Sequence, residues 1–310
     1  MILLLPGLLL ITAACSKETI NTVEGTLNIE VTDAPVDDAQ VKGVLVTVGG
    51  LELDDRPVAG FKTTTFDLLD LRNGKIRTLI DSRITAGTYH KLTLVLDFDT
   101  EANGNTPGCY VLDADGRKHP LRSDTNRIGL SMALDITAGQ SSVFILDFDL
   151  RKCIKRQEND PGDSYDFVPE AELAEGLRII RGNQSGVIKG NCTDVVTNSD
   201  RIVVYAYRKG TYMRDSEVHG SGESQLEFSN AENSSVVDTA GNYMIPFLTP
   251  GEYEIHFCSY RETDGGIMNP DGTLLIDAAG AVNPGGVPVG ASQSTTVNVT
   301  VTGLLPIPAP

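Results

Sequence analysis

Alternation of apolar and polar residues with a period of two is the feature that most constrains the fold of this chain. From Gly25 onward, runs rich in Val, Ile, Thr, Leu and Phe alternate in this way and are broken by clusters of Gly, Pro, Asn and Asp. Successive side chains of a strand point to opposite faces, so this pattern is typical of antiparallel strands and turns. Long amphipathic helices are not apparent. The chain is therefore predicted to be all-β.

The predicted strands fall into two groups, and each group is large enough for a β-sandwich. The length of 310 residues likewise favours two domains. The strands are expected at 27–32, 41–48, 61–67, 89–97, 110–113, 128–134 and 142–150 in the first group, and at 185–190, 201–207, 225–228, 242–247, 253–258 and 295–302 in the second. We expect an all-β fold of two β-sandwich domains in tandem, of the immunoglobulin-like or transthyretin-like kind.

Changes in composition set the expected domain boundaries. The polar run from Gln157 to Asp163 predicts a linker or surface excursion, in which Pro169 could begin one or two helical turns. The last residues carry three prolines and are expected to fray. The expected domains are 25–155 for the first sandwich, 156–176 for the linker, 177–303 for the second sandwich and 304–310 for the tail.

One short pattern occurs twice in the first domain. Ile-Thr-Ala-Gly at 84–87 leads into Leu-Asp-Phe-Asp at 96–99, and the same residues recur at 136–139 and 146–149. We interpret the copies as two similar hairpin entries, since glycine permits the tight corner before each strand. Each pair of aspartates shares one face of its strand, which we expect to be solvated. A pair of glycosidase-type acids is the alternative interpretation, and the repetition argues against it.

The N-terminus has the features of an export signal. Residues 1–14 hold two leucine-rich runs and end in Ala13 and Ala14 before Cys15, a stretch too short to span a bilayer. The segment resembles the signal peptide of bacterial lipoproteins, which implies that Cys15 is lipidated and that 15–24 is a tether. No Lys or Arg precedes the apolar run, and Thr12 replaces the usual Leu. An ordinary secretory signal remains the alternative.

The four other cysteines form an even set in an exported chain, which favours disulfides. Two fall in each expected domain, so we predict bonds between Cys109 and Cys153 and between Cys192 and Cys258. Metal binding is less favoured, because the chain has no CxxC or CxxH spacing.

Two family resemblances follow from longer motifs. The segment Gly25–Pro35, with Phe66–Leu71, Ala86–Tyr89 and Leu146–Asp149, resembles a domain of unknown function, the 4382 family, found in lipoproteins of Bacteroidota. The Asp-Gly-Tyr and Leu-Pro-Gly-Tyr pattern within 238–253 is similar to carboxypeptidase-regulatory-like and Cna-B-like domains. The first resemblance implies an exported module without an established activity, and the second implies a transthyretin-like sandwich.

Enzyme chemistry is not expected. The sequence lacks HExxH, GxSxG, GxGxxG and phosphate-loop motifs, so no cofactor is predicted. Nucleic acid is not expected as a partner, because a surface with a net charge of −17 would repel phosphate backbones.

Two binding sites are considered. Calcium could use acids in loops, and the candidate ligands are Asp33, Asp37, Asp38, Asp113 and Asp115, although ordinary Asp turns explain the same residues. A sugar could stack on tyrosines, for which Tyr205 and Tyr207 are the candidates. Burial of these tyrosines within the strand packing is the other interpretation.

These observations together predict a non-catalytic lipoprotein of the bacterial outer membrane that faces the periplasm or the cell surface. Its membrane contact would be the lipid on Cys15. Its role would be adhesion, the binding of a glycan or surface protein, or that of a spacer. A carbohydrate-binding accessory lipoprotein of a glycan-uptake system is the alternative.

Overall fold

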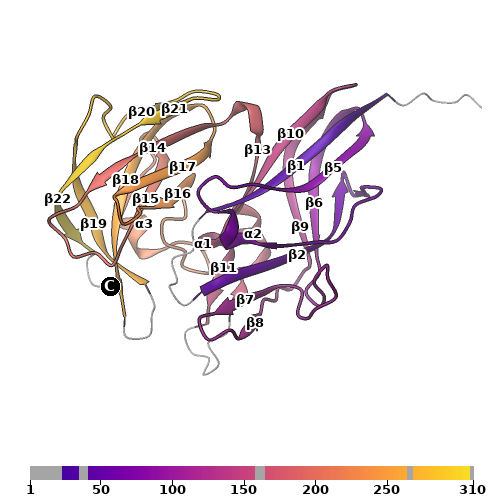
Figure 1. Cartoon of the computed structure of the whole chain (residues 1–310), viewed down its shortest axis with the longest axis horizontal. Coiled ribbons are helices and arrows are strands. Elements are labelled where there is room, and N and C mark those ends of the chain that lie inside the picture. The colour runs from indigo at the N-terminus through magenta and orange to yellow at the C-terminus, as the bar shows by residue number, and fades with distance from the viewer. Residues whose placement is uncertain (1–22, 35–40, 158–164, 264–267, 308–310) are drawn as a thin grey trace, which may run out of the picture.

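The structure, a computed structural model, describes residues 23–34, 41–157, 165–263 and 268–307. Its regular structure is mostly β, and each half of the chain forms a β-sandwich (Figure 1). The prediction of an all-β chain with two sandwiches in tandem is confirmed. Within these ranges, no helix is long and apolar enough to cross a membrane. The expected signal peptide and Cys15 lie outside the described residues.

Two sheets form the first sandwich. In spatial order, the first sheet consists of β13 (Leu177–Arg181), β10 (Ser141–Asp149), β1 (Glu24–Ala34) and β5 (Arg77–Thr85). The second consists of β8 (Lys118–Pro120), β7 (Tyr110–Asp113), β2 (Val41–Leu53), β6 (Gly87–Leu96) and β9 (Arg127–Ile136), with β3 (Arg56–Pro57) and β4 (Thr64–Asp67) also paired to β2. The pair β1–β10 is parallel, whereas β10–β13 is antiparallel.

The period of two explains the core of this sandwich. Every second residue of β1, at Leu27, Ile29 and Val31, is buried, and Phe144 and Leu146 of β10 lie on the same face. These side chains meet the inward residues of β6 from the other sheet. Burial of apolar side chains on both inner faces therefore holds the two sheets together.

The repeated Ile-Thr-Ala-Gly segments are corners between sheets and not hairpin entries. The first joins β5 to β6 and the second joins β9 to β10, and in both cases the two strands belong to different sheets. Gly139 takes a φ of 69°, which favours glycine. The hairpin interpretation is wrong because a local motif specifies a turn but not the partner strand that follows it.

The first sandwich extends beyond the expected boundary at residue 155. A small sheet of β11 (Ile154–Arg156) and β12 (Tyr165–Phe167) leads to helix α2 (Glu170–Glu175), which follows Pro169 as predicted. Phe167 and Leu173 are buried in the core of the first sandwich. Residues 165–176 are thus not a linker. The strand from Leu177, expected to open the second domain, instead pairs with β10. Its apolar residues complete a sheet edge of the first sandwich.

The second sandwich contains nine strands, of which seven form one continuous path. The path runs through β16 (Asn233–Val236), β15 (Arg201–Arg208), β18 (Gly251–Glu262), β19 (Met268–Ala278), β22 (Val299–Pro306), β14 (Gly186–Thr193) and β17 (Asn242–Leu248), while β20 (Val287–Val289) pairs with β18 and β21 (Ser294–Thr296) pairs with β14. Residues from strands along the whole path share one buried core that includes Val204, Ile245 and Phe257. The path must therefore fold over on itself.

The prediction that the tail frays is wrong for residues 304–306, which belong to a strand. Strand β22 continues to this residue, and Leu304 and Pro306 pair with Leu274 and Gly272 of β19. On its other side β22 pairs with β14 only near Val299 and Thr300. Pro306 therefore lies on a locally free edge, where its missing N–H is not needed.

The remaining short helices lie in the connections. They are η1 (Leu68–Leu71), α1 (Leu150–Cys153), η2 (Gly182–Gln184) and α3 (Arg214–His219). The connection between β15 and β16, residues 209–232, contains α3 followed by turns at 225–228, where a strand was expected. Leu226 of this connection packs against the core of the first sandwich. The second sandwich therefore contacts the first through this connection.

Candidate functional site

The structure separates the acids that were considered for calcium. Asp33 is buried at the end of β1, while Asp113 ends β7 and Asp115 lies in the exposed turn that follows. The carboxylate of Asp113 accepts the N–H groups of Asp115 and Arg117 at 2.9 and 2.8 Å and pairs with His119. This is an ordinary Asp turn. Across the described ranges, no group of three or more His, Cys, Asp or Glu residues is arranged to hold a metal ion. Asp37 and Asp38 lie outside those ranges.

Tyr205 and Tyr207 are fully buried, so they do not offer a stacking surface to a sugar. The ring of Tyr205 stacks on Phe228 with centroids 4.2 Å apart. The hydroxyl of Tyr207 donates to Glu217 Oε2 at 2.8 Å. Helix α3 and the turns after it cover this face of β15, which strand alternation alone does not reveal. The proposed ligand role of both residues is therefore wrong.

Within the described residues, the four cysteines are buried and form no disulfide with one another, so the predicted disulfides are wrong. Cys192 packs in the main core of the second sandwich, whereas Cys258 packs in a separate cluster with Tyr205. Cys109 directly precedes β7 and its Sγ approaches Asp97 O at 3.4 Å, while Cys153 ends helix α1. Burial raises the pKa of Cys109 and of Cys192 to about 12. These residues act as small core side chains.

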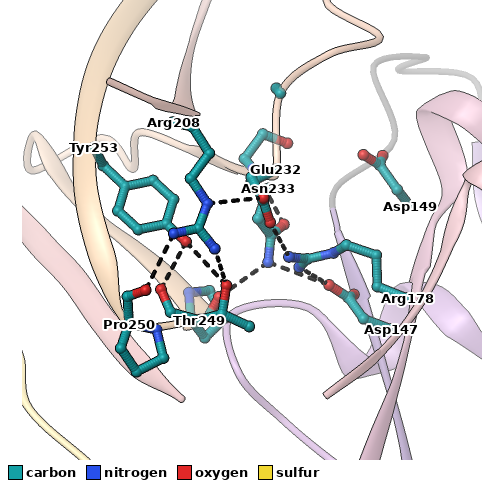
Figure 2. A network of polar contacts seen from close by, with 12 residues as sticks. Asp147, Asp149, Arg178, Arg208, Glu232, Asn233, Thr249, Pro250 and Tyr253 are labelled. Carbon is teal, nitrogen blue, oxygen red and sulfur yellow. Dashed lines mark hydrogen bonds and ion pairs between the residues drawn. The ribbon is translucent and has the colours of Figure 1, made fainter. Parts of the chain in front are cut away.

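The principal polar feature is a charge network where the two sandwiches meet (Figure 2). It starts at Asp147 on β10, whose carboxylate is 1% exposed and forms an ion pair with Arg178 on the adjacent β13. These residues lie opposite each other in the strand register, which fixes the pair. Arg178 Nη1 then donates to Glu232 Oε2 at 3.3 Å, and Glu232 belongs to the second sandwich. The network therefore crosses the junction.

On the side of the second sandwich, Arg208 continues the network. Its Nε donates to Glu232 Oε1 at 3.1 Å and its Nη1 donates to the carbonyl of Pro250 at 3.1 Å. The guanidinium lies 4.7 Å from the ring centroid of Tyr253, within the range of a cation–π contact. Figure 2 shows Glu232 between the two arginines. One carboxylate thus links the guanidinium groups of both sandwiches.

One amide group and one ammonium group add direct bonds across the junction. Asn233 Nδ2 donates to Asp147 Oδ2 at 3.3 Å and to the carbonyl of Pro246 at 3.0 Å. Lys152 Nζ, on α1, donates to the carbonyl of Ala231 at 2.6 Å. These bonds satisfy buried polar groups from both sides.

Burial dominates the electrostatics of this region. It raises the pKa of Asp147 despite the opposing effect of Arg178, and it lowers the pKa of Lys152. Burial also raises the pKa of Asp33 well above its usual range, and the charges of Asp147 and Asp149 add to that shift. Asp149 itself accepts from Arg151 Nη2 at 2.6 Å. The network therefore pairs Asp147, Asp149 and Glu232 with arginines at a low-dielectric junction.

Sequence reasoning missed this site. Asp147 and Asp149 were expected on a solvated face, but they are only 1% and 4% exposed. A usable signal was present in Arg178, because a charged residue within the apolar run Leu-Arg-Ile-Ile requires a partner when the strand is buried. The partner itself could not be read from the sequence.

Residues 24–169 match a family described as a domain of unknown function, DUF4382. This segment is a DUF4382 domain. The resemblance predicted from the sequence is confirmed to that extent. The DUF4382 domain supplies all of the first sandwich except α2 and β13, which lie beyond the matched residues. No curated protein matches the chain.

Several solved structures resemble the chain at low similarity. They include a leucine-rich repeat protein from Bacteroides thetaiotaomicron VPI-5482 (11% identity, TM-score 0.23, covering 90% of this chain and 26% of that chain), the minor pilin of Streptococcus agalactiae (12%, 0.21, 91% and 99%) and the major pilin subunit of Bacillus cereus (9%, 0.22, 90% and 70%). The chain thus spans about a quarter of the first of these proteins. At TM-scores of 0.21 to 0.23 these likenesses do not define the fold, which the strand pairing defines instead.

Proposed function

We propose that this chain is an exported, non-catalytic surface module for binding, adhesion or spacing, in which the DUF4382 domain and the second sandwich act as one rigid unit. The charge network at the junction carries this proposal. Interfaces between domains of one chain are commonly small and permit relative motion. Here, Asp147, Arg178, Glu232 and Arg208 form a chain of ion pairs from one sandwich to the other. Separation of the sandwiches would break the bonds of Arg178 to Glu232, of Asp147 to Asn233 and of Lys152 to Ala231, which together hold the two bodies in one relative orientation.

The environment of the acids supports a non-catalytic role. A glycosidase needs two carboxyl groups that face a substrate across an open site. Asp147 and Asp149 instead form ion pairs with arginines inside the junction. Asp97, in the first copy of the repeat, caps its own turn by accepting the N–H groups of Asp99 and Thr100. These contacts give the repeated acids structural roles.

Anchoring through Cys15 is the membrane part of the proposal, and it rests on the sequence of the first fifteen residues. In a Gram-negative host, the full chain should incorporate labelled palmitate, and Cys15→Ser should abolish the label. Protease treatment of intact cells then tests surface exposure. Absence of label from the unsubstituted chain would refute the lipid anchor.

The rigid unit can be tested by small-angle X-ray scattering of the chain in solution. Glu232→Gln weakens both arginine contacts and should broaden the distribution of interdomain distances. Glu252→Gln is the matched control, because it removes only the exposed pair with Lys209. A broad distribution in the unsubstituted chain, or equal effects of the two substitutions, would overturn the rigid-unit proposal.

Binding is tested separately by adhesion of cells that display the chain, compared at equal surface amounts with cells that display Glu232→Gln. Adhesion that falls when the junction is loosened supports the proposal. A glycan array, run with calcium and again with a chelator, addresses the carbohydrate alternative. Saturable binding of one glycan class would favour that alternative over the adhesion role.

A further inference from the structure

A groove runs along the junction beside the charge network. Its volume is about 550 Å³, within the range of ligand sites in proteins. One wall comes from β9, with Leu130 and Met132, and the other from β13, with Ile179. Glu232 and Thr249 of the second sandwich complete the lining. An occupant would therefore contact both sandwiches.

Both walls of the groove are formed by the last strands of their sheets. Strand β13 ends the order β13-β10-β1-β5, and β9 ends the order β8-β7-β2-β6-β9. Among the described strands, neither has a partner on its outer side. Figure 1 shows β13 between the two sandwiches. A free strand edge exposes main-chain N–H and C=O groups that can pair with an added chain.

The register shows which groups of β13 are available. Asp149 N donates to Gly176 O at 2.8 Å, and the two residues lie opposite each other. Because hydrogen-bonded pairs alternate along an antiparallel ladder, Arg178 bonds toward β10 while Ile179 turns its N–H and C=O away from β10. The same alternation turns the main-chain groups of Leu177 outward. The outer edge of β13 therefore presents the main-chain N–H and C=O groups of every second residue, which is the spacing that pairing with an extended chain requires.

Charge selects the kind of chain that fits. Among the charged residues that line the groove, Glu232 already pairs with Arg178 and Arg208, whereas Glu175 is exposed, and the remaining walls are largely apolar. The protein as a whole carries a net charge of −17, so a second copy would be repelled. An extended segment with apolar side chains at alternate positions and a basic residue near Glu175 is complementary.

We propose that this groove binds an extended, apolar and basic peptide segment of another protein, which adds as a strand to the outer edge of β13. This inference specifies the partner for the binding role proposed above, but it is independent of lipid anchoring and of glycan recognition. Main-chain hydrogen bonds would provide affinity, and the alternate side chains would provide selectivity.

The test begins with selection from a library of displayed linear peptides on the purified full chain. A synthetic peptide of the selected sequence is then titrated by fluorescence anisotropy. Ile179→Pro removes the outward N–H but leaves the ladder to β10 intact, and should weaken binding at least about tenfold, the equivalent of about 1.4 kcal/mol. Ile179→Val is the matched control and should retain binding.

A second variant keeps the test valid if circular dichroism shows that Ile179→Pro does not fold. Glu175 is exposed, so Glu175→Lys should fold normally and still weaken a basic peptide. Hydrogen exchange of the Ile179 amide should slow when the peptide binds. Unchanged affinity in Ile179→Pro or in Glu175→Lys would overturn the proposal. If the unsubstituted chain dimerises and Ile179→Pro abolishes the dimer, the occupant is a second copy of the chain, and the proposal is also overturned. None of these readouts depends on Cys15 or on scattering.

Discussion

Substitution of Arg178 by Met should destabilise the protein by about 3 to 5 kcal/mol at neutral pH. The Asp147 carboxylate is 1% exposed and the Arg178 side chain is 19% exposed, so solvent cannot replace the lost guanidinium. Asn233 remains as a donor to Asp147, but an amide does not neutralise the charge. The cost is that of a buried carboxylate left without its cation.

The free energy of unfolding can be measured by urea titration with far-ultraviolet circular dichroism, since the chain contains no Trp. Arg181→Met is the matched control. Arg181 lies on the same strand and pairs with Asp135, whose side chain is 48% exposed, so its loss should cost at most about 1 kcal/mol. Equal losses of stability in the two variants would refute the argument from burial.

The pH dependence gives a second check on the same variant. Burial raises the pKa of Asp147 in the folded protein, and Arg178 opposes that shift. Without Arg178 the folded pKa should rise further above the unfolded value. A raised carboxyl pKa gives stability at low pH that is lost as pH rises through the folded pKa. The deficit of Arg178→Met should therefore shrink on acidification, and a constant deficit would contradict this mechanism.

Three further predictions follow from buried groups. Asp33→Asn should be more stable than the unsubstituted chain at alkaline pH and equally stable in acid, because the raised pKa of Asp33 makes the folded protein lose stability as pH increases. Urea titrations across pH measure this difference, and a lower stability of Asp33→Asn at alkaline pH would contradict it. Tyr207→Phe should cost about 1 to 3 kcal/mol in the same assay by depriving the buried Glu217 of a donor, and a neutral effect would mean that water replaces the hydroxyl. Cys109 and Cys192, as buried thiols with pKa values of about 12, should resist alkylation until urea unfolds the chain, as mapped by mass spectrometry, and labelling of the native protein would count against their burial.

The sequence was sufficient for the class of the fold. Alternating residues such as Leu27, Ile29 and Val31 specify a strand with one apolar face, and enough such strands occur in each half to require a sandwich. The helical turn after Pro169 was also predictable, because proline favours the first position of a helix. These features depend on neighbours along the chain.

Strand partners were not predictable in the same way. The segment from Leu177 reads as a strand in either domain, and only its pairing with β10 assigns it to the first sandwich. The two Ile-Thr-Ala-Gly corners similarly look like hairpin entries until the sheets are known. Local sequence specifies that the chain turns, while the choice of partner depends on packing between residues far apart in the sequence.

The two copies of Leu-Asp-Phe-Asp show most clearly what the sequence alone determined. In the second copy, alternation places both aspartates on the face of β10 opposite the leucine, whereas in the first copy β6 ends at Leu96 and the aspartates lie in the turn that follows. At Asp97 the side chain caps a turn near the surface, whereas at Asp147 it is buried and paired with Arg178. The sequence thus determined which side chains share a face of the strand. Only the tertiary structure decided what covers that face, because the second sandwich packs against Asp147 through contacts that no local pattern encodes.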